Sequence, residues 1–210
     1  MNERLSPREY WEKSQLTERP LEAYEKLLNL EIETLRSKII LDLGSGKNEE
    51  FARGLKDKGV EAEVVSVNPQ LAVEEQEKDQ TNHENAVAAI AQTLPFAKDS
   101  FDIILSLDAV PLYLPSDNMG EYKKAFFEID RVLKPGGEVR IYPIREFEKE
   151  SKANEQSPLI SVIEDLENRG YEIIWEEYNP SEQEMEKYKT VGGLRLIIKK
   201  PKNENPNKAF

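Results

Sequence analysis

The sequence predicts an α/β domain with a doubly wound, mostly parallel sheet, and three patterns lead to this prediction. Short apolar segments, typical of strands that are buried on both faces, alternate with segments of helical periodicity. A turn with two glycines, at 44–46, follows the first of these apolar segments. Between the last two apolar segments we expect only a loop or about one helical turn, which favours an antiparallel hairpin that closes the sheet.

The same patterns predict the order of the elements. Residues 1–36 read as helical, because Ser6-Pro7 suits a helix start and apolar residues recur at helical spacing after Pro20. We expect an N-terminal helical extension or lid at 1–36, the α/β domain at 37–200 and a disordered polar tail at 201–210. The Lys-Pro-Gly-Gly stretch at 134–137 predicts a turn. The predicted strands are 38–43, 63–67, 86–91, 101–107, 138–142, 171–176 and 194–199, and the predicted helices are 48–58, 121–133 and 158–169.

The charge balance narrows the classes of partner. The chain of 210 residues has 29 Lys and Arg against 41 Asp and Glu, a formal net charge of -12. Such a charge repels phosphate backbones and anionic lipid, so we expect neither nucleic acid nor a membrane as partner.

The absence of Cys excludes disulfides and zinc–thiolate sites, and we expect no metal. The charged start lacks the apolar region of a secretory signal, so we expect a cytoplasmic protein. No pattern predicts an oligomeric state.

The turn after the first strand predicts a ligand site. Ligands of open α/β sheets bind at the carboxyl ends of the strands, and Gly44 and Gly46 would let a ligand approach the backbone closely. A dinucleotide fingerprint needs a third glycine at position 49, where the chain has Glu49, followed by Glu50. A carboxylate at Asp42 suits a cationic amino-acid ligand better than a diphosphate. These observations disfavour a nicotinamide-dependent oxidoreductase.

Four separated stretches give the chain a resemblance to a known family. They are 40–46, with the glycine turn, 94–102, which begins Leu-Pro-Phe, 106–109 after the fourth strand, and 131–138, with Lys-Pro-Gly-Gly. In this order and spacing they resemble the class I S-adenosylmethionine-dependent methyltransferases, in particular the broad small-molecule group with the Leu-Pro-Phe motif. The resemblance implies a Rossmann-like fold, S-adenosylmethionine as cofactor and methyl transfer to a small-molecule acceptor.

The resemblance also implies roles for individual residues. The glycine turn would admit the methionine portion of the cofactor, and Asp42 would support its amino group directly or through water. The residue that closes the second strand would hold the ribose hydroxyls. Two residues before the Leu-Pro-Phe motif would border the adenine, and a backbone carbonyl of the fourth strand would lie near the sulfonium. The implied cofactor-binding residues are therefore Asp42, Gly44, Gly46, Asn68, Ala91, Gln92 and Ser106.

Three positions depart from the family's pattern and predict a partly degenerate cofactor site. Asn48 stands where a third glycine is usual, and Ile90 stands where an acid often contacts the adenine amine. Asn68 stands where the family has an acid for the ribose. An amide lacks the charge-assisted strength of a carboxylate, so we expect an affinity loss of about tenfold. A non-catalytic methyltransferase-like binding or scaffold protein is therefore the alternative function.

Few residues are candidates for the acceptor side. Asp108 follows the fourth strand at the ligand end of the sheet, where its carboxylate can orient a donor group or simply cap the following turn. Tyr113 can line the acceptor pocket or pack in the core. Tyr10 and Trp11 can form a lid over the cofactor, as N-terminal helices do in the family, or pack against the domain. The single histidine, His83, lies in a polar stretch and is expected at the surface.

Overall fold

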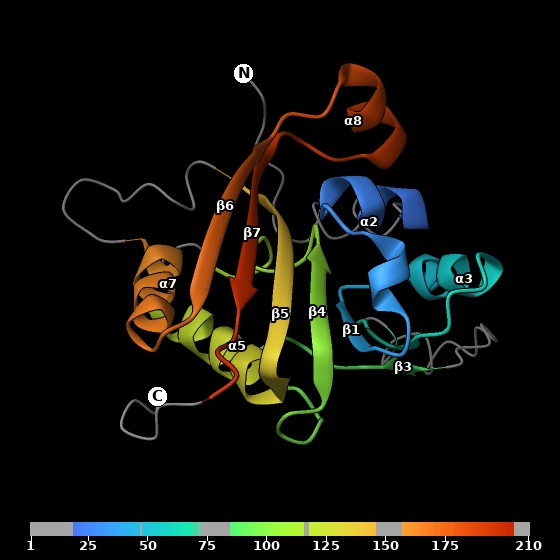
Figure 1. Cartoon of the computed structure of the whole chain (residues 1–210). Coiled ribbons are helices and arrows are strands. Elements are labelled where there is room, and N and C mark those ends of the chain that lie inside the picture. The colour runs from blue at the N-terminus through green and yellow to red at the C-terminus, as the bar shows by residue number, and fades with distance from the viewer. Residues whose placement is uncertain are drawn as a thin grey trace.

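The computed structural model describes residues 19–46, 48–69, 71, 85–115, 118–145 and 157–203. It has a seven-stranded sheet in the order β3-β2-β1-β4-β5-β7-β6 (Figure 1). The strands are β1 (Ile39–Leu43), β2 (Glu63–Val67), β3 (Ala86–Val87), β4 (Phe101–Leu107), β5 (Leu133–Ile144), β6 (Glu172–Tyr178) and β7 (Gly193–Lys199). The helices are α2 (Leu21–Leu27), α3 (Glu50–Asp57), α5 (Met119–Val132), α7 (Pro158–Asn168) and α8 (Glu182–Tyr188), with a 3₁₀ helix η1 at Ile32–Leu35.

The strand pairing confirms the predicted fold class. Strands β3, β2, β1, β4 and β5 pair in parallel, whereas β7 is antiparallel to both β5 and β6. The sequence order reverses at β1, which lies between β2 and β4. In such a sheet the carboxyl ends of β1, β2 and β4 meet at one edge, which is where open α/β sheets bind ligands.

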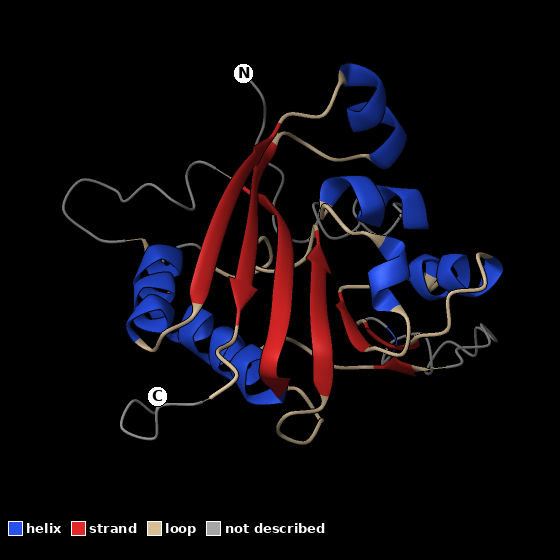
Figure 2. Cartoon of the chain, viewed as in Figure 1, coloured by secondary structure: helices blue, strands red, loops and turns tan. Residues whose placement is uncertain are grey.

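Helices cover both faces of the sheet, as Figures 1 and 2 show. In β1 the side chain of Ile40 packs in one apolar cluster with α2, η1 and α3, and those of Leu41 and Leu43 pack in the other cluster with α5 and α7. This division follows from the alternation of side chains along a strand. Because both faces are covered, the strands read as continuous apolar runs in the sequence.

Several elements differ from the predicted ones. β3 has only two residues instead of the predicted 86–91, because Ile90 and Thr93 form an isolated bridge that turns the chain. β5 begins at Leu133 and continues through the predicted turn at 134–137. Its register jumps from the pair Phe101–Leu133 to the pair Ile103–Glu138, so the intervening residues bulge out of the ladder.

The connection between β6 and β7 is more ordered than the loop or single helical turn that was predicted. It contains α8, which begins with a capping box in which Ser181 and Glu184 each bond the backbone of the other. Residues 1–18 and 204–210, which make up half of the predicted N-terminal extension and most of the predicted tail, lie outside the described residues. Within the described part of the chain, no helix combines the length and the apolar character needed to cross a bilayer.

Candidate active site

A cavity of about 210 Å³ lies at the carboxyl ends of β1, β2 and β4. It runs between the glycine turn after β1, the end of β2, the turn before the Leu-Pro-Phe stretch and the loop after β4. Most of its wall is apolar, with a few polar groups. It is lined by Leu43, Gly44, Gly46, Val67, Asn68, Pro69, Ala89, Ile90, Ala91, Gln92, Asp108, Ala109, Val110, Tyr113 and Leu114.

The glycine turn requires glycine at position 44 for two reasons. Its φ is 91°, a value that other residues rarely adopt. A Cβ atom there would also lie 2.3 Å from the Cβ of Ala109, so the loop after β4 can approach only a glycine. At Gly46, whose φ is 74°, the position of a Cβ meets no atom within 4 Å, so this side of the turn is open. The backbone of the turn is therefore accessible to a ligand.

The end of β2 is tied to this turn. The carbonyl of Val67 accepts hydrogen bonds from Gly44 N (2.8 Å) and Ser45 N (3.3 Å). The side-chain amide of Asn68 donates to Gly46 O at 2.9 Å. Asn68 is 6% exposed and lines the cavity, so the predicted ribose position does lie beside the glycine turn.

Asp42 lies beneath the turn and does not line the cavity. It shares the face of β1 that α2 covers, and it is 1% exposed. The hydroxyl of Tyr24, in α2, lies 3.1 and 3.0 Å from its two carboxylate oxygens and donates to them. Burial raises the pKa of Asp42 to about 7 against the effect of this bond, and the nearby Glu49 carboxylate raises it further. Asp42 is therefore a carboxyl group that titrates near neutral pH.

Ser106 is also buried rather than exposed to the cavity. Its hydroxyl accepts a hydrogen bond from Val110 N at 2.8 Å and lies 3.3 Å from Val110 O, to which it can donate. These bonds fold the chain back just after β4. Ser106 thus shapes the loop that carries Asp108 and Tyr113, which do line the cavity.

Asp108 forms an ion pair that the sequence did not reveal. Arg19 Nη2 lies 2.6 Å and Nε 2.9 Å from Asp108 Oδ2, and both side chains are largely buried. Arg19 also donates to the carbonyl of Lys189, directly after α8, at 3.1 Å. Burial raises the pKa of Asp108, although the charges of Arg19 and Arg145 and the hydroxyl of Thr190 oppose that rise. Arg19 thus joins the N-terminal segment, the loop after β4 and the α8–β7 connection at the cavity.

Helix α5 fixes the turn that borders the other end of the cavity. Gln92 donates to Glu121 at 3.2 Å, and Leu94 N donates to Glu128 at 2.8 Å. Arg131 donates to the carbonyls of Leu94 (2.9 Å) and Phe96 (2.7 Å). The Leu-Pro-Phe stretch is therefore held to α5 by charged side chains as well as by packing.

The cavity thus brings together most of the predicted site residues. Of the nine candidates, two are buried away from it (Asp42 and Ser106) and seven line it (Gly44, Gly46, Asn68, Ala91, Gln92, Asp108 and Tyr113). Tyr10, Trp11 and His83 lie outside the described residues. In the part of the chain that the structure describes, no group of three or more His, Asp or Glu is placed to hold a metal ion.

Sequence reasoning missed three residues that shape the site. Arg19 and Thr190 lie far from Asp108 in the sequence, so no local pattern links them to it. Tyr24 is one of the residues that recur at helical spacing after Pro20, and nothing in that repeat marked it as a partner of Asp42. A signal was nevertheless present, because strand alternation places Asp42 on the same face as Ile40, where a buried carboxylate needs a polar partner.

Comparison with known proteins places the chain near methyltransferases. The sequence profile of the methyltransferase domain matches residues 41–141, from β1 to within β5. A demethylmenaquinone methyltransferase of Thermus thermophilus is 36% identical over 104 residues. The alignment covers 48% of this chain and 44% of that protein, so the chain spans less than half the length of this curated relative.

Solved structures share the fold at low sequence identity. The N-methyltransferase NodS of Bradyrhizobium japonicum WM9 superposes with a TM-score of 0.57 and 15% identity, over 86% of this chain and 95% of that one. The [4+2]-cyclase SpnF superposes with a TM-score of 0.56 and 17% identity, over 87% and 80% of the two chains. At such identities these likenesses concern the fold alone.

Proposed function

We propose that this chain is a class I S-adenosylmethionine-dependent methyltransferase that transfers a methyl group to a small-molecule acceptor. The observation that carries the proposal is the cavity at the carboxyl ends of β1, β2 and β4, with the glycine turn in its wall. Asp108 and Tyr113 are the proposed acceptor-side residues.

The residues around the cavity fit S-adenosylmethionine. The open backbone at Gly46 leaves room for the methionine portion, and Asn68 offers an amide at the proposed ribose position. Ala91 and Gln92 belong to a largely apolar wall, which suits an adenine ring. Asp42, one layer below, does not line the cavity, but its carboxyl group would be favoured in the ionised form by the cationic amino group of a bound cofactor.

When bound, S-adenosylmethionine supplies an electrophilic methyl group on a sulfonium, so the protein mainly has to align the acceptor and exclude water. The apolar side chains of Val110 and Leu114 keep water from the acceptor side of the cavity. Asp108 can hold a donor group of the acceptor, and Arg19 keeps the Asp108 carboxylate in place. With this neutralising partner, Asp108 is a weaker attractant for a cationic acceptor than its charge alone would suggest.

Calorimetric titration with S-adenosylmethionine and S-adenosylhomocysteine, with NAD as control, tests the cofactor assignment. We expect micromolar binding of both sulfur compounds and no heat from NAD. Absence of binding at millimolar cofactor would contradict the proposal. A panel of acceptors then tests the reaction through formation of S-adenosylhomocysteine, and demethylmenaquinone, the compound in the Thermus relative's name, belongs in that panel.

A second candidate is a protein that binds the cofactor without transferring its methyl group. Two observations favour it: Ile90, where an acid is common, is 49% exposed, and Gln92 is bonded to Glu121. In that case the cofactor would bind but no acceptor class would yield S-adenosylhomocysteine. The two candidates therefore give the same titration and differ in the acceptor panel.

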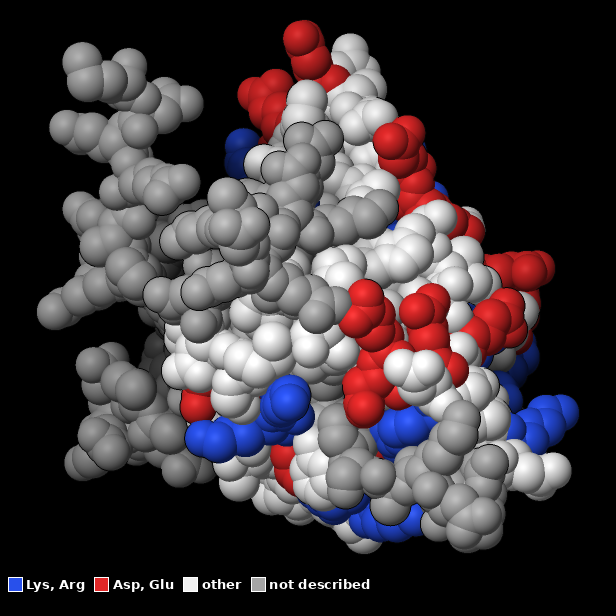
Figure 3. Space-filling model, turned by 90° about the vertical axis from the view of Figure 1, so that its left-hand side faces the viewer, with Lys and Arg blue, Asp and Glu red and all other residues white. Residues whose placement is uncertain are grey.

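The surface charge supports a small molecule rather than nucleic acid as partner. Several acidic groups are visible on the face shown in Figure 3, on the side of α7 and β6. The exposed acids of these two elements include Glu164, Asp165, Glu167, Glu172 and Glu177. A polyanion would be repelled there. The cytoplasmic location expected from the sequence is part of the same proposal.

A further inference from the structure

The glycine turn is attached to the end of β2 at both of its ends. On one side, Gly44 N and Ser45 N donate to the carbonyl of Val67. On the other side, the Asn68 side chain donates to Gly46 O at 2.9 Å. The first attachment uses backbone groups that any sequence would provide. The second depends on the side chain at position 68.

The second attachment requires a hydrogen-bond donor. A side-chain amide has one, whereas an ionised carboxylate has acceptors only. An aspartate at position 68 would place a negatively charged oxygen where the amide nitrogen now meets Gly46 O. Because Asn68 is 6% exposed, little water could separate the two oxygens.

The bond matters because it ties Gly46 to a neighbouring strand, whereas the other side chain that donates to Gly46 O, the Ser45 hydroxyl at 3.3 Å, belongs to the turn itself. Gly46 has a φ of 74° and no atom within 4 Å of the position of a Cβ. A glycine with open space around it has many accessible conformations. Fixing the Gly46 carbonyl therefore selects one conformation of the peptide that forms the cavity wall. Asn68 is itself anchored, because its backbone N donates to Val87 O in β3 at 3.1 Å.

We propose that Asn68 is a positioning residue for cofactor binding, whose amide holds the glycine turn in the shape that accepts the cofactor. In this chain an amide at position 68 therefore binds the cofactor more tightly than a carboxylate would. This inference rests on the proposed function and reverses the expectation from the family's pattern, in which an acid at this position strengthens binding.

Titration with S-adenosylhomocysteine at pH 8 tests the inference with two variants of the full chain. Asn68→Ala removes the donor, and Asn68→Asp removes the donor and adds repulsion. We expect the dissociation constant to rise about fivefold in Asn68→Ala and about tenfold or more in Asn68→Asp. Asn118→Asp is the matched control, because Asn118 caps α5 with its side-chain oxygen, which an aspartate also provides. It should bind as the wild type does.

The pH dependence separates a donor role from a merely structural one. A protonated carboxyl group can donate to Gly46 O, so the ratio of the Asn68→Asp dissociation constant to that of the wild type should fall between pH 8 and pH 5. Taking the ratio cancels the titration of Asp42, which both proteins contain and which lies close to the turn.

Two results would overturn the inference alone: Asn68→Asp binding as tightly as the wild type or tighter at pH 8, or a ratio that does not change with pH. A wild-type protein that fails to bind S-adenosylhomocysteine at millimolar concentration would overturn the proposed function, and this inference with it. Binding by the wild type together with the expected order of variants would support both.

Discussion

The two ends of the central strands hold buried carboxylates in opposite ways. At the amino-terminal end of β5, Asp130 accepts hydrogen bonds from Arg169 (2.6 Å) and from the hydroxyl of Tyr171, and Lys200 Nζ lies 3.2 Å away. At the carboxyl-terminal end of β1, Asp42 has the Tyr24 hydroxyl as its hydrogen-bond partner, and the charged neighbour that affects its pKa is another acid, Glu49.

The pKa values express this difference. Burial alone would raise the pKa of Asp130, but the bonds from Tyr171 and Arg169 and the charge of Lys200 outweigh it, so that its pKa is lowered. At the other end burial prevails, and it raises the pKa of Asp42 to about 7 and that of Asp108 as well. The amino-terminal end of β5 is therefore electrostatically complete, because cations already neutralise its carboxylate, and we call it the complete end. The cavity end, in contrast, carries carboxyl groups that a bound cation would stabilise.

The largest effect is expected at the complete end. Lys200 is 4% exposed, and its ammonium donates to the carbonyls of Asp130 and Leu133, both at 2.9 Å. Lys200→Met leaves the two carbonyls without their donor and the Asp130 carboxylate with Arg169 as its remaining cation, which should lower the free energy of unfolding by about 4 kcal/mol. Urea-induced unfolding of the variant and the wild type measures this change in the free energy of unfolding. Lys199→Met, which removes only an exposed pair with Glu172, is the control and should cost below about 1 kcal/mol.

At the cavity end, the pair between Arg19 and Asp108 should contribute less to stability and more to function. Arg19→Gln leaves the Asp108 carboxyl with its raised pKa and without its cation, and should lower the free energy of unfolding by about 2 to 3 kcal/mol. Asp108→Asn added to Arg19→Gln should recover part of this loss, since it removes the unpaired charge. A double variant no more stable than Arg19→Gln would contradict the assigned pairing.

A third prediction uses pH to separate the two ends. The pKa of Asp42 is about 7 in the folded chain and about 3.9 in an unfolded one, so the folded state binds the proton more tightly. The resulting stabilisation is fully present below the unfolded pKa and is lost as pH rises through the folded one. Between pH 5.5 and pH 8, the Asp42 contribution should fall by about 2 kcal/mol.

Asp42→Asn keeps an oxygen for the Tyr24 hydroxyl and removes the titration. Denaturant unfolding of this variant at the two pH values should show a decline smaller than that of the wild type by this amount. An equal decline in the two proteins would mean that Asp42 does not titrate near neutral pH.

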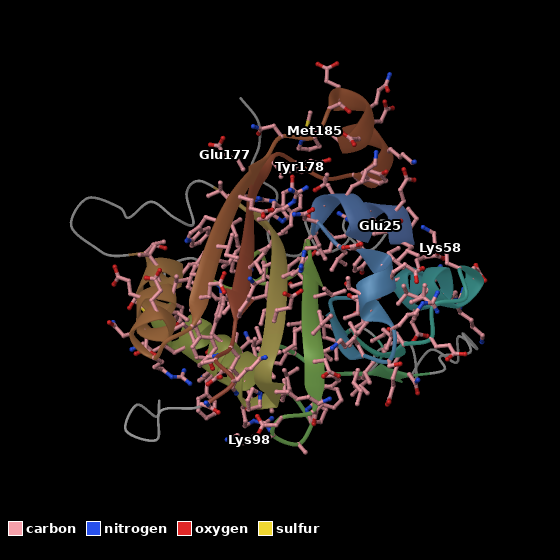
Figure 4. All side chains as sticks on the ribbon, viewed as in Figure 1. Glu25, Lys58, Lys98, Glu177, Tyr178 and Met185 are labelled. Atoms are coloured by element: carbon pink, nitrogen blue, oxygen red, sulfur yellow. The ribbon has the colours of Figure 1, made fainter. Side chains whose placement is uncertain are left out.

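The smallest effect is expected at an ion pair that belongs to neither end. Lys58 and Glu25 pair at 2.9 Å on the outer surface of α3 and α2, where Figure 4 labels both. Both side chains are partly exposed, so Lys58→Gln should change the free energy of unfolding by less than about 0.5 kcal/mol and leave cofactor binding unchanged. Thermal unfolding with and without S-adenosylhomocysteine measures both the stability of the variant and its binding of the ligand. A change in ligand affinity would show that α2 transmits surface changes to the cavity.

The fold could be predicted where the signal is local. The strands expected at 63–67 and 101–107 begin and end at those residues in the structure, because both are apolar runs bounded by turn residues. The strand expected at 86–91 was wrong beyond Val87, because an apolar residue at position 90 suits an exposed turn position equally well when the chain reverses there.

The residues that line the site could be predicted from the sequence, but the hydrogen bonds and ion pairs between them could not. The glycine turn, Asn68 and the residues before Leu94 were placed by sequence motifs, and they do line one cavity. The partners of the acids could not be found in this way. Arg19 reaches Asp108 across 89 positions, and such a meeting depends on how the helices pack on the sheet rather than on any local pattern.

Hydrogen–deuterium exchange of the wild type with and without S-adenosylhomocysteine tests most directly whether the cavity end is the cofactor site. The account predicts slower exchange at residues 44–46 and 89–92, which line the cavity, and no change at residues 169–171 and 200–203, at the complete end. Protection confined to the complete end, or no protection at saturating ligand, would contradict it.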